Sequence, residues 1–96
     1  MRKYEVMFIV RPDLEVEANK QVAESMKKIL TDKGATIIDE KEMGQKELAY
    51  EIKKYKTGYY YLYTVEAKDN VATKEFDRLA RISEDVIRHL IVKVEA

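Results

Sequence analysis

The chain has 96 residues, 46% of them hydrophobic, which is enough for one compact domain over residues 1–96 and too few for two. Its 18 Lys and Arg balance its 18 Asp and Glu, so no whole-molecule field attracts nucleic acid and any RNA contact must come from local patches. The absence of cysteine excludes disulfides, thiolate metal sites and cysteine nucleophiles, and it fits a reducing cytosol. Because Glu5 interrupts the amino-terminal apolar run and no run is long enough to span a membrane, we expect a soluble protein that keeps its full chain.

The first two predicted elements are a strand and a helix. Residues 3–10 are rich in β-branched and aromatic side chains, and they end before Pro12. Residues 14–33 repeat apolar side chains every three or four positions, which predicts an amphipathic helix. We expect Asp13 to cap its start and Gly34 to end it in the left-handed conformation. One face of the strand is wholly apolar and should meet the helices: Tyr4, Val6, Phe8 and Val10.

A long hairpin follows. Residues 35–53 predict one strand bent at Gly44, because the alternation changes phase there, as it does at a β-bulge. After Gly44 the apolar residues Leu48, Tyr50 and Ile52 take every second position, which predicts a buried face. We expect residues 54–58 to form a turn with a basic tip, and the tyrosine-rich residues 59–67 to return as the third strand.

The chain ends with a second helix and a last strand. Asp69 or Asn70 suits the start of a helix whose apolar residues include Phe76 and which stops before Ser83. Residues 86–94 predict the closing strand.

This order predicts an α+β, ferredoxin-like fold, in which a four-stranded antiparallel sheet carries two helices on one face. The first and third strands should be central. By alternation, the uncovered face should carry Met7, Ile9, Tyr60, Leu62, Thr64, His89, Ile91 and Lys93. Its apolar members are candidates for a protein-partner surface: Met7, Ile9, Tyr60, Leu62 and Ile91.

No residue pattern points to catalysis, a metal or a cofactor. His89 is the only histidine and has no cysteine or carboxylate at a ligand spacing, so we interpret it as a packing or surface residue. Ser25 and Ser83 lack a base in any motif, and the isolated glycines form no phosphate-binding loop. We therefore expect a protein without enzymatic activity.

The third strand is weakly similar to the aromatic motif of RNA-recognition modules. Alternation places Tyr61 and Tyr63 against the helices, so core packing is the better interpretation. Tyr60 stays a candidate for base stacking, and a free-standing module that binds single-stranded RNA is the alternative function.

Basic residues form local groups that suit phosphate contacts, although each group also fits an ordinary solvated face. We expect Arg2 and Lys3, at the start of a central strand, to converge with Arg88 on its neighbour. The candidate RNA-binding residues from charge alone are Arg2, Lys3, Lys53, Lys54, Lys56 and Arg88.

Several short motifs, taken together and in order, resemble the bacterial small-subunit ribosomal protein S6 family. They are an opening Met-Arg-x-Tyr-Glu-Val, Arg11-Pro12, Gly34-Ala35, the stretch Gly-x-Lys-x-Leu-Ala-Tyr-x-Ile-Lys at 44–53, Gly58-Tyr59 and Ile87-Arg88-His89. The resemblance implies a ferredoxin-like fold, no enzymatic activity and a structural role in the cytoplasmic ribosome. It also implies a heterodimer with ribosomal protein S18 that binds the central domain of the small-subunit ribosomal RNA. Many relatives carry two arginines where this chain has Lys46 and Glu47, so the resemblance carries RNA contact to Lys46 only.

Overall fold

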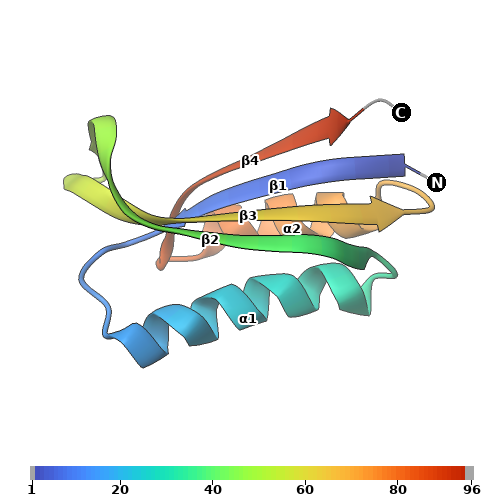
Figure 1. The fold of residues 1–96 in the computed structure, drawn as a ribbon, viewed down its shortest axis with the longest axis horizontal. Helices are drawn as coiled ribbons and strands as arrows, with labels where there is room; N and C mark the ends of the chain where they lie inside the picture. Colours follow the sequence, from blue (N-terminus) through green and yellow to red (C-terminus); the bar gives the residue numbers. More distant parts are fainter. Residues whose placement is uncertain (1, 95–96) are drawn as a thin grey trace.

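The computed structural model describes residues 2–94 and shows the predicted ferredoxin-like arrangement (Figure 1). The elements are β1 (Arg2–Val10), α1 (Val16–Asp32), β2 (Thr36–Ile52), β3 (Tyr55–Ala67), α2 (Val71–Ile82) and β4 (Val86–Val94). The sheet order is β2-β3-β1-β4, every neighbouring pair is antiparallel, and both helices cover the same face. β1 and β3 are therefore central, as predicted, and β2 and β4 are the edges.

The core lies between the sheet and the helices, and aromatic rings dominate its centre. The ring of Phe8 stacks on Tyr61 at 5.1 Å, meets Tyr63 edge-on at 5.5 Å and lies 5.8 Å from Phe76 of α2. Burial raises the pKa of Tyr61 and of Tyr63, so both hydroxyls stay protonated and donate hydrogen bonds to α1. Tyr61 donates to Oδ1 of Asn19, and Tyr63 donates to the carbonyl of Ala23. The predicted inward faces of β1 and β3 are confirmed.

The ends of the helices agree only partly with prediction. Gly34 takes φ +94° after α1, as expected for a helix stop. The predicted cap at Asp13 is wrong, because α1 begins at Val16 and Glu15 stands at the cap position without a side-chain bond. Asp13 instead pairs with Arg11 at 3.4 Å. At α2, the carboxylate of Asp69 accepts a hydrogen bond from the N–H of Val71 at 3.0 Å, as one of the two predicted caps.

The long hairpin is bent where Gly44 predicted it. Gly44 has φ +79°, and the register between β2 and β3 shifts between Glu42 and Gly44. The predicted turn at 54–58 is wrong, since Lys53 and Lys54 alone form the turn, with φ of +49° and +72°. Two successive residues in the left-handed conformation match the twist of the strands that a two-residue hairpin loop joins. In this hairpin both of them are lysines. Gly58 lies inside β3 and is buried, because the side chain of Ile9 packs over it.

The predicted outward set on β4 is wrong, because a bulge reverses the alternation. Val10 pairs with Val86 but Ile9 pairs with Arg88, so Ile87 is an extra residue in β4. A single extra residue moves every later side chain to the other face. His89 and Ile91 therefore lie on the helix side, whereas Arg88, Leu90 and Val92 lie on the uncovered side, opposite Ile9, Met7 and Glu5 of β1.

Candidate RNA and protein interface

The uncovered face of the sheet carries a band of apolar side chains across three of its four strands, β3, β1 and β4. In register, Met7 lies between Leu62 of β3 and Leu90 of β4. Leu90 is 53% exposed and Val92 46%, while Met7, Tyr60 and Leu62 are half-buried. We call this surface the open face; its members are Met7, Ile9, Tyr60, Leu62, Leu90 and Val92. Sequence reasoning missed Leu90 and Val92, because no glycine marks the bulge at Ile87.

Ile9 and Ile91 contribute less to this face than predicted. Ile9 is only 2% exposed, since it packs over Gly58. Ile91 lies on the helix side and packs against the core. Of the five predicted partner-surface residues, the structure leaves Met7, Tyr60 and Leu62 accessible on the open face.

The end of the β2–β3 hairpin turns away from the helices, toward the side of the sheet that they leave uncovered (Figure 1). There Arg88 of β4 donates a hydrogen bond from Nη1 to the hydroxyl oxygen of Tyr50 at 2.7 Å, and its guanidinium carbon lies 5.7 Å from the ring centroid. Tyr50 is 60% exposed, so the prediction that it lies on a buried face is wrong. The reason is that the register of the hairpin is irregular between Glu47 and Ile52, so alternation does not place Tyr50, and its side chain reaches Arg88 on the uncovered side.

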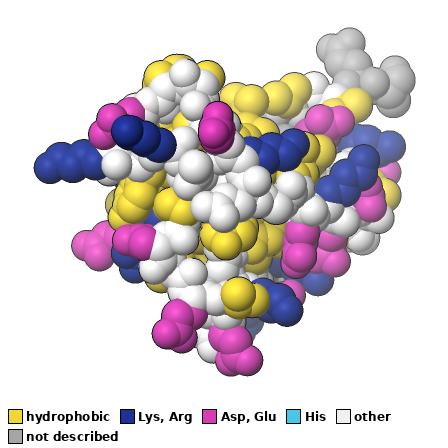
Figure 2. Space-filling model, turned by 60° about the vertical axis from the view of Figure 1, so that its left-hand side comes forward, with side chains coloured by type: hydrophobic (Ala, Val, Ile, Leu, Met, Phe, Trp, Pro, Cys, Tyr) yellow, Lys and Arg dark blue, Asp and Glu magenta, His cyan; other side chains and the backbone are white. Residues whose placement is uncertain are grey.

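Four exposed lysines gather at this end of the molecule. Lys53 and Lys54 form the turn, Lys56 follows them in β3, and Lys46 pairs with Gly58 across the hairpin. We call Lys46, Lys53, Lys54 and Lys56 the basic hairpin end. Arg88 reaches the same region through its bond to Tyr50. Figure 2, with this side turned forward, shows hydrophobic side chains at the surface among acidic and basic ones.

The predicted convergence of Arg2, Lys3 and Arg88 is wrong. Lys3 pairs with Val94 and Ile9 pairs with Arg88, so Lys3 and Arg88 lie near opposite ends of the β1–β4 ladder. Six positions along a strand correspond to about 20 Å. Arg2 and Lys3 therefore form a separate exposed basic pair at the far end of the sheet from Arg88.

His89 lies against α2. Its Nε2 lies 2.6 Å from Oδ1 of Asp77 on α2, and its ring meets Phe76 edge-on. The bond to His89, followed by the charge of Arg81, holds the pKa of Asp77 below its ordinary value. Over residues 2–94, no group of three or more His, Cys, Asp and Glu side chains is arranged to hold a metal ion.

Comparison with known proteins decides the family. The family model for ribosomal protein S6 matches residues 3–93. The chain belongs to the ribosomal protein S6 family. The crystal structure of the 30S ribosomal protein S6 from Thermotoga maritima is similar, with a TM-score of 0.91 and 30% identity, over 97% of this chain and 87% of that one.

Membership in the S6 family makes the chain a structural, non-enzymatic protein of the small ribosomal subunit. A second solved structure shows only that the fold recurs elsewhere: the carboxy-terminal domain of the MgtC protein from Mycobacterium tuberculosis has a TM-score of 0.61 at 14% identity, over 99% of this chain and 89% of that one. Neither helix in the described part of this S6-family chain is long and apolar enough to cross a membrane.

Proposed function

We propose that this S6-family chain binds the central domain of the small-subunit ribosomal RNA as a heterodimer with ribosomal protein S18, in the cytoplasm. One observation carries the proposal. The basic hairpin end lies beside the apolar open face, and the bond between Arg88 and Tyr50 connects the two. A surface of this kind suits a phosphate backbone on one part and an apolar protein partner on the other.

The lysines of the hairpin end are placed for phosphate contact. They are exposed, and Lys53 and Lys54 stand at the outermost turn of the hairpin. Arg2 and Lys3 offer a second contact at the opposite end of the sheet. Because the net charge is zero, such contacts alone give weak attraction, and a basic partner would supply the rest.

The open face supplies the partner surface in this proposal. Leu90 and Val92 are the exposed apolar side chains of the edge strand β4, next to Met7 on β1. Burying them against another protein would remove apolar area from water. Tyr60 and Leu62 extend the same surface onto β3.

The alternative, a free-standing module for single-stranded RNA, has less support. Such modules stack successive bases on several aromatic side chains of the open sheet face. Here Tyr61 and Tyr63 are buried against the helices, and of the four tyrosines at 59, 60, 61 and 63 only Tyr60 lies on the open side of β3. Tight, specific binding of single-stranded RNA by the isolated chain would overturn the leading proposal.

The RNA contact is tested by filter binding of small-subunit RNA at several salt concentrations, with S18 present. The hairpin variant combines Lys53→Asn, Lys54→Gly and Lys56→Gln, which removes three charges while giving the two left-handed positions residues that favour them. We expect weaker binding and a slope of log K against log salt that is shallower by about 0.7 to 0.9 per lost phosphate contact. A matched variant, Lys28→Gln with Lys68→Gln and Lys74→Gln, removes the same charge from exposed positions elsewhere. Equal effects in the two variants would show that the hairpin end makes no specific contact.

The partner surface is tested by calorimetric titration with S18. Leu90→Asp places a charge on the open face, and Ile82→Asp places one on α2, where Ile82 is 68% exposed. We expect Leu90→Asp to abolish binding and Ile82→Asp to leave it unchanged. Unchanged binding in Leu90→Asp would exclude the open face as the S18 site.

A further inference from the structure

The bend of the β2–β3 hairpin near its tip comes from extra residues in β2. Glu47 pairs with Thr57 across the hairpin. The next pair is Ile52 with Tyr55, so β2 advances five positions where β3 advances two. The three additional residues form a bulge, and a bulge bends its strand and redirects the side chains. In Figure 1 the hairpin curves here toward the uncovered side of the sheet, and the turn lysines at its tip follow that curve.

Burial does little to hold this bent segment in place. Between residues 47 and 57 every side chain is exposed or half-buried. Four of them are half-buried: Leu48, Ile52, Tyr55 and Thr57. Segments with few buried apolar contacts fluctuate and open most readily. The direction in which the lysines point must therefore depend on individual contacts between the hairpin and the rest of the molecule.

The first such contact joins Tyr50 to β4. Tyr50 lies within the irregular segment, and its hydroxyl oxygen accepts a hydrogen bond from Nη1 of Arg88 at 2.7 Å. The guanidinium carbon of Arg88 also lies 5.7 Å from the centroid of the Tyr50 ring, within the range of cation–π attraction. Because β2 and β4 are the two edges of the sheet, this contact ties one edge to the other on the uncovered side.

The second contact joins Tyr55 to the loop after β1. Its hydroxyl donates a hydrogen bond to Oδ2 of Asp13 at 3.4 Å, and Asp13 pairs with Arg11 at 3.4 Å. Arg11 is itself held by Asp85, whose carboxylate accepts from Nε and whose carbonyl accepts from the backbone N–H, each at 2.9 Å. The hydroxyl of Tyr55, followed by Asp85, raises the pKa of Arg11. These contacts connect the hairpin to the residue that precedes β4.

We propose that the hydroxyls of Tyr50 and Tyr55 brace the bent hairpin at two points and so position the basic hairpin end for the phosphates of RNA. Both are positioning residues, since they act through Arg88 and Asp13. A hairpin that is ordered beforehand loses less conformational entropy when it binds. The proposal rests on the RNA contact proposed above for the hairpin lysines, and it assigns a role in that contact to two uncharged side chains.

The first test measures the order of the hairpin in the free chain. The hydroxyl variant combines Tyr50→Phe with Tyr55→Phe, which keeps both rings. Backbone nuclear magnetic resonance relaxation should show order parameters for the turn amides, at residues 53 and 54, that fall from about 0.85 to below about 0.6. Amides of β1 should stay rigid, because the core is untouched. Unchanged order parameters at the turn would overturn the proposal.

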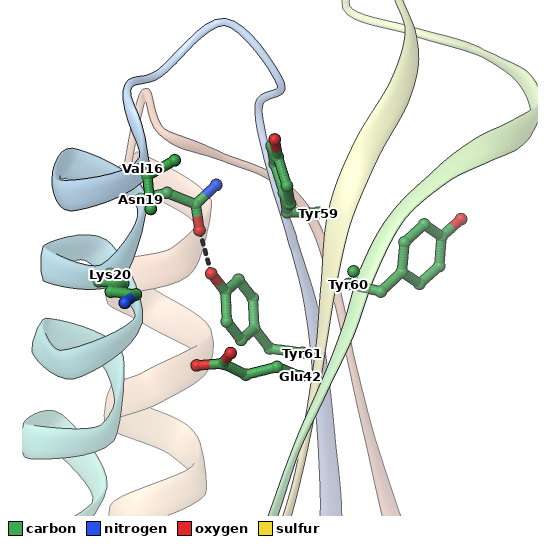
Figure 3. A pocket seen from close by; sticks show the side chains of 8 residues that line it. Val16, Asn19, Lys20, Glu42, Tyr59, Tyr60 and Tyr61 are labelled. Carbon is green, nitrogen blue, oxygen red and sulfur yellow. Dashed lines mark hydrogen bonds between the residues drawn. The ribbon is translucent and has the colours of Figure 1, made fainter.

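The control for this test is Tyr59→Phe, which also removes one hydroxyl from β3. Tyr59 lies on the α1 side of the sheet, where it lines a pocket with Asn19 (Figure 3). We expect the turn amides to keep their order parameters in this control. An equal loss of order in Tyr59→Phe would show that the turn responds to any lost hydroxyl on β3, and it would overturn the brace.

The second test is filter binding of small-subunit RNA, with S18 present, at several salt concentrations. The hydroxyl variant should bind about three- to tenfold more weakly, because the hairpin must be ordered on binding. The slope of log K against log salt should stay that of the parent chain, since no charge is removed. The hairpin variant described above should instead make the slope shallower. A shallower slope in the hydroxyl variant, or unchanged affinity, would overturn the positioning role.

The two variants distinguish failure of the brace from failure of the RNA contact. If the hairpin variant weakens RNA binding and the hydroxyl variant does not, the lysines contact RNA and the brace is wrong. If neither variant weakens binding, the RNA contact at the hairpin end is wrong, and the positioning role is overturned with it.

Discussion

Both faces of the sheet carry apolar side chains, but only one of them is covered. On the helix side Phe8, Tyr61 and Phe76 pack ring against ring and are at most 5% exposed. On the open face Leu90 and Val92 are about half exposed, at 53% and 46%. The hydrophobicity of a side chain therefore does not show whether it stabilises this fold. The side chains that do so are those that the layer of helices covers.

The open face is itself uneven. Near the hairpin, Ile9 and Ile87 are buried, and their side chains lie over Gly58. Toward the middle of the sheet, Met7 and Leu90 are accessible. The comparison thus separates three environments: a covered core, a closed corner and an exposed band.

The largest expected difference is between Phe8 and Leu90. Phe8→Ala should lower the free energy of unfolding by about 3 to 5 kcal/mol, because it removes the ring at the centre of the core. Leu90→Ala should change it by about 0.5 kcal/mol or less, as for an exposed residue. Urea unfolding followed by circular dichroism measures both. A comparable loss in Leu90→Ala would mean that the open face is buried in solution, for example by self-association.

This division also explains which sequence predictions succeeded. In β1 and β3, alternation placed Val6, Phe8 and Tyr63 correctly, because each central strand is bonded on both sides and keeps its register over the core. Gly44 revealed its bulge because glycine readily takes a positive φ. The bulge at Ile87 had no such signal, and it reversed the faces of β4.

The candidate site was less predictable because it depends on register and coverage. Alternation made Tyr50 look buried, but the sequence does not show the irregular register between Glu47 and Ile52, which interrupts the alternation there. Arg88 was assigned to the correct neighbouring strand, yet its pairing with Ile9, not with Lys3, separates it from the amino-terminal basic pair. The lysines at 53, 54 and 56 were recognised from local charge alone, and they do lie together.

The closed corner should give an intermediate effect. Gly58→Ala should cost about 1 to 3 kcal/mol, because the new methyl group would overlap Cγ2 of Ile9. Ile9→Ala removes that atom, so the double variant should be less destabilised than the sum of the two single variants. Urea unfolding of the four proteins in this cycle measures the coupling. Additive losses would show that Gly58 is needed for its backbone and not for its lack of a side chain.

The smallest and sharpest test removes one hydroxyl from each face. Tyr61→Phe leaves the amide of Asn19 without its partner in the core, so it should cost about 1 to 3 kcal/mol. Tyr50→Phe removes the acceptor for Arg88 at an exposed site, so it should change stability by about 0.5 kcal/mol or less. The chemical change is identical, and only the covering differs. If Tyr50→Phe were as costly as Tyr61→Phe, the hairpin end would have to pack against the open face in solution, and the apolar band proposed for S18 would already be occupied.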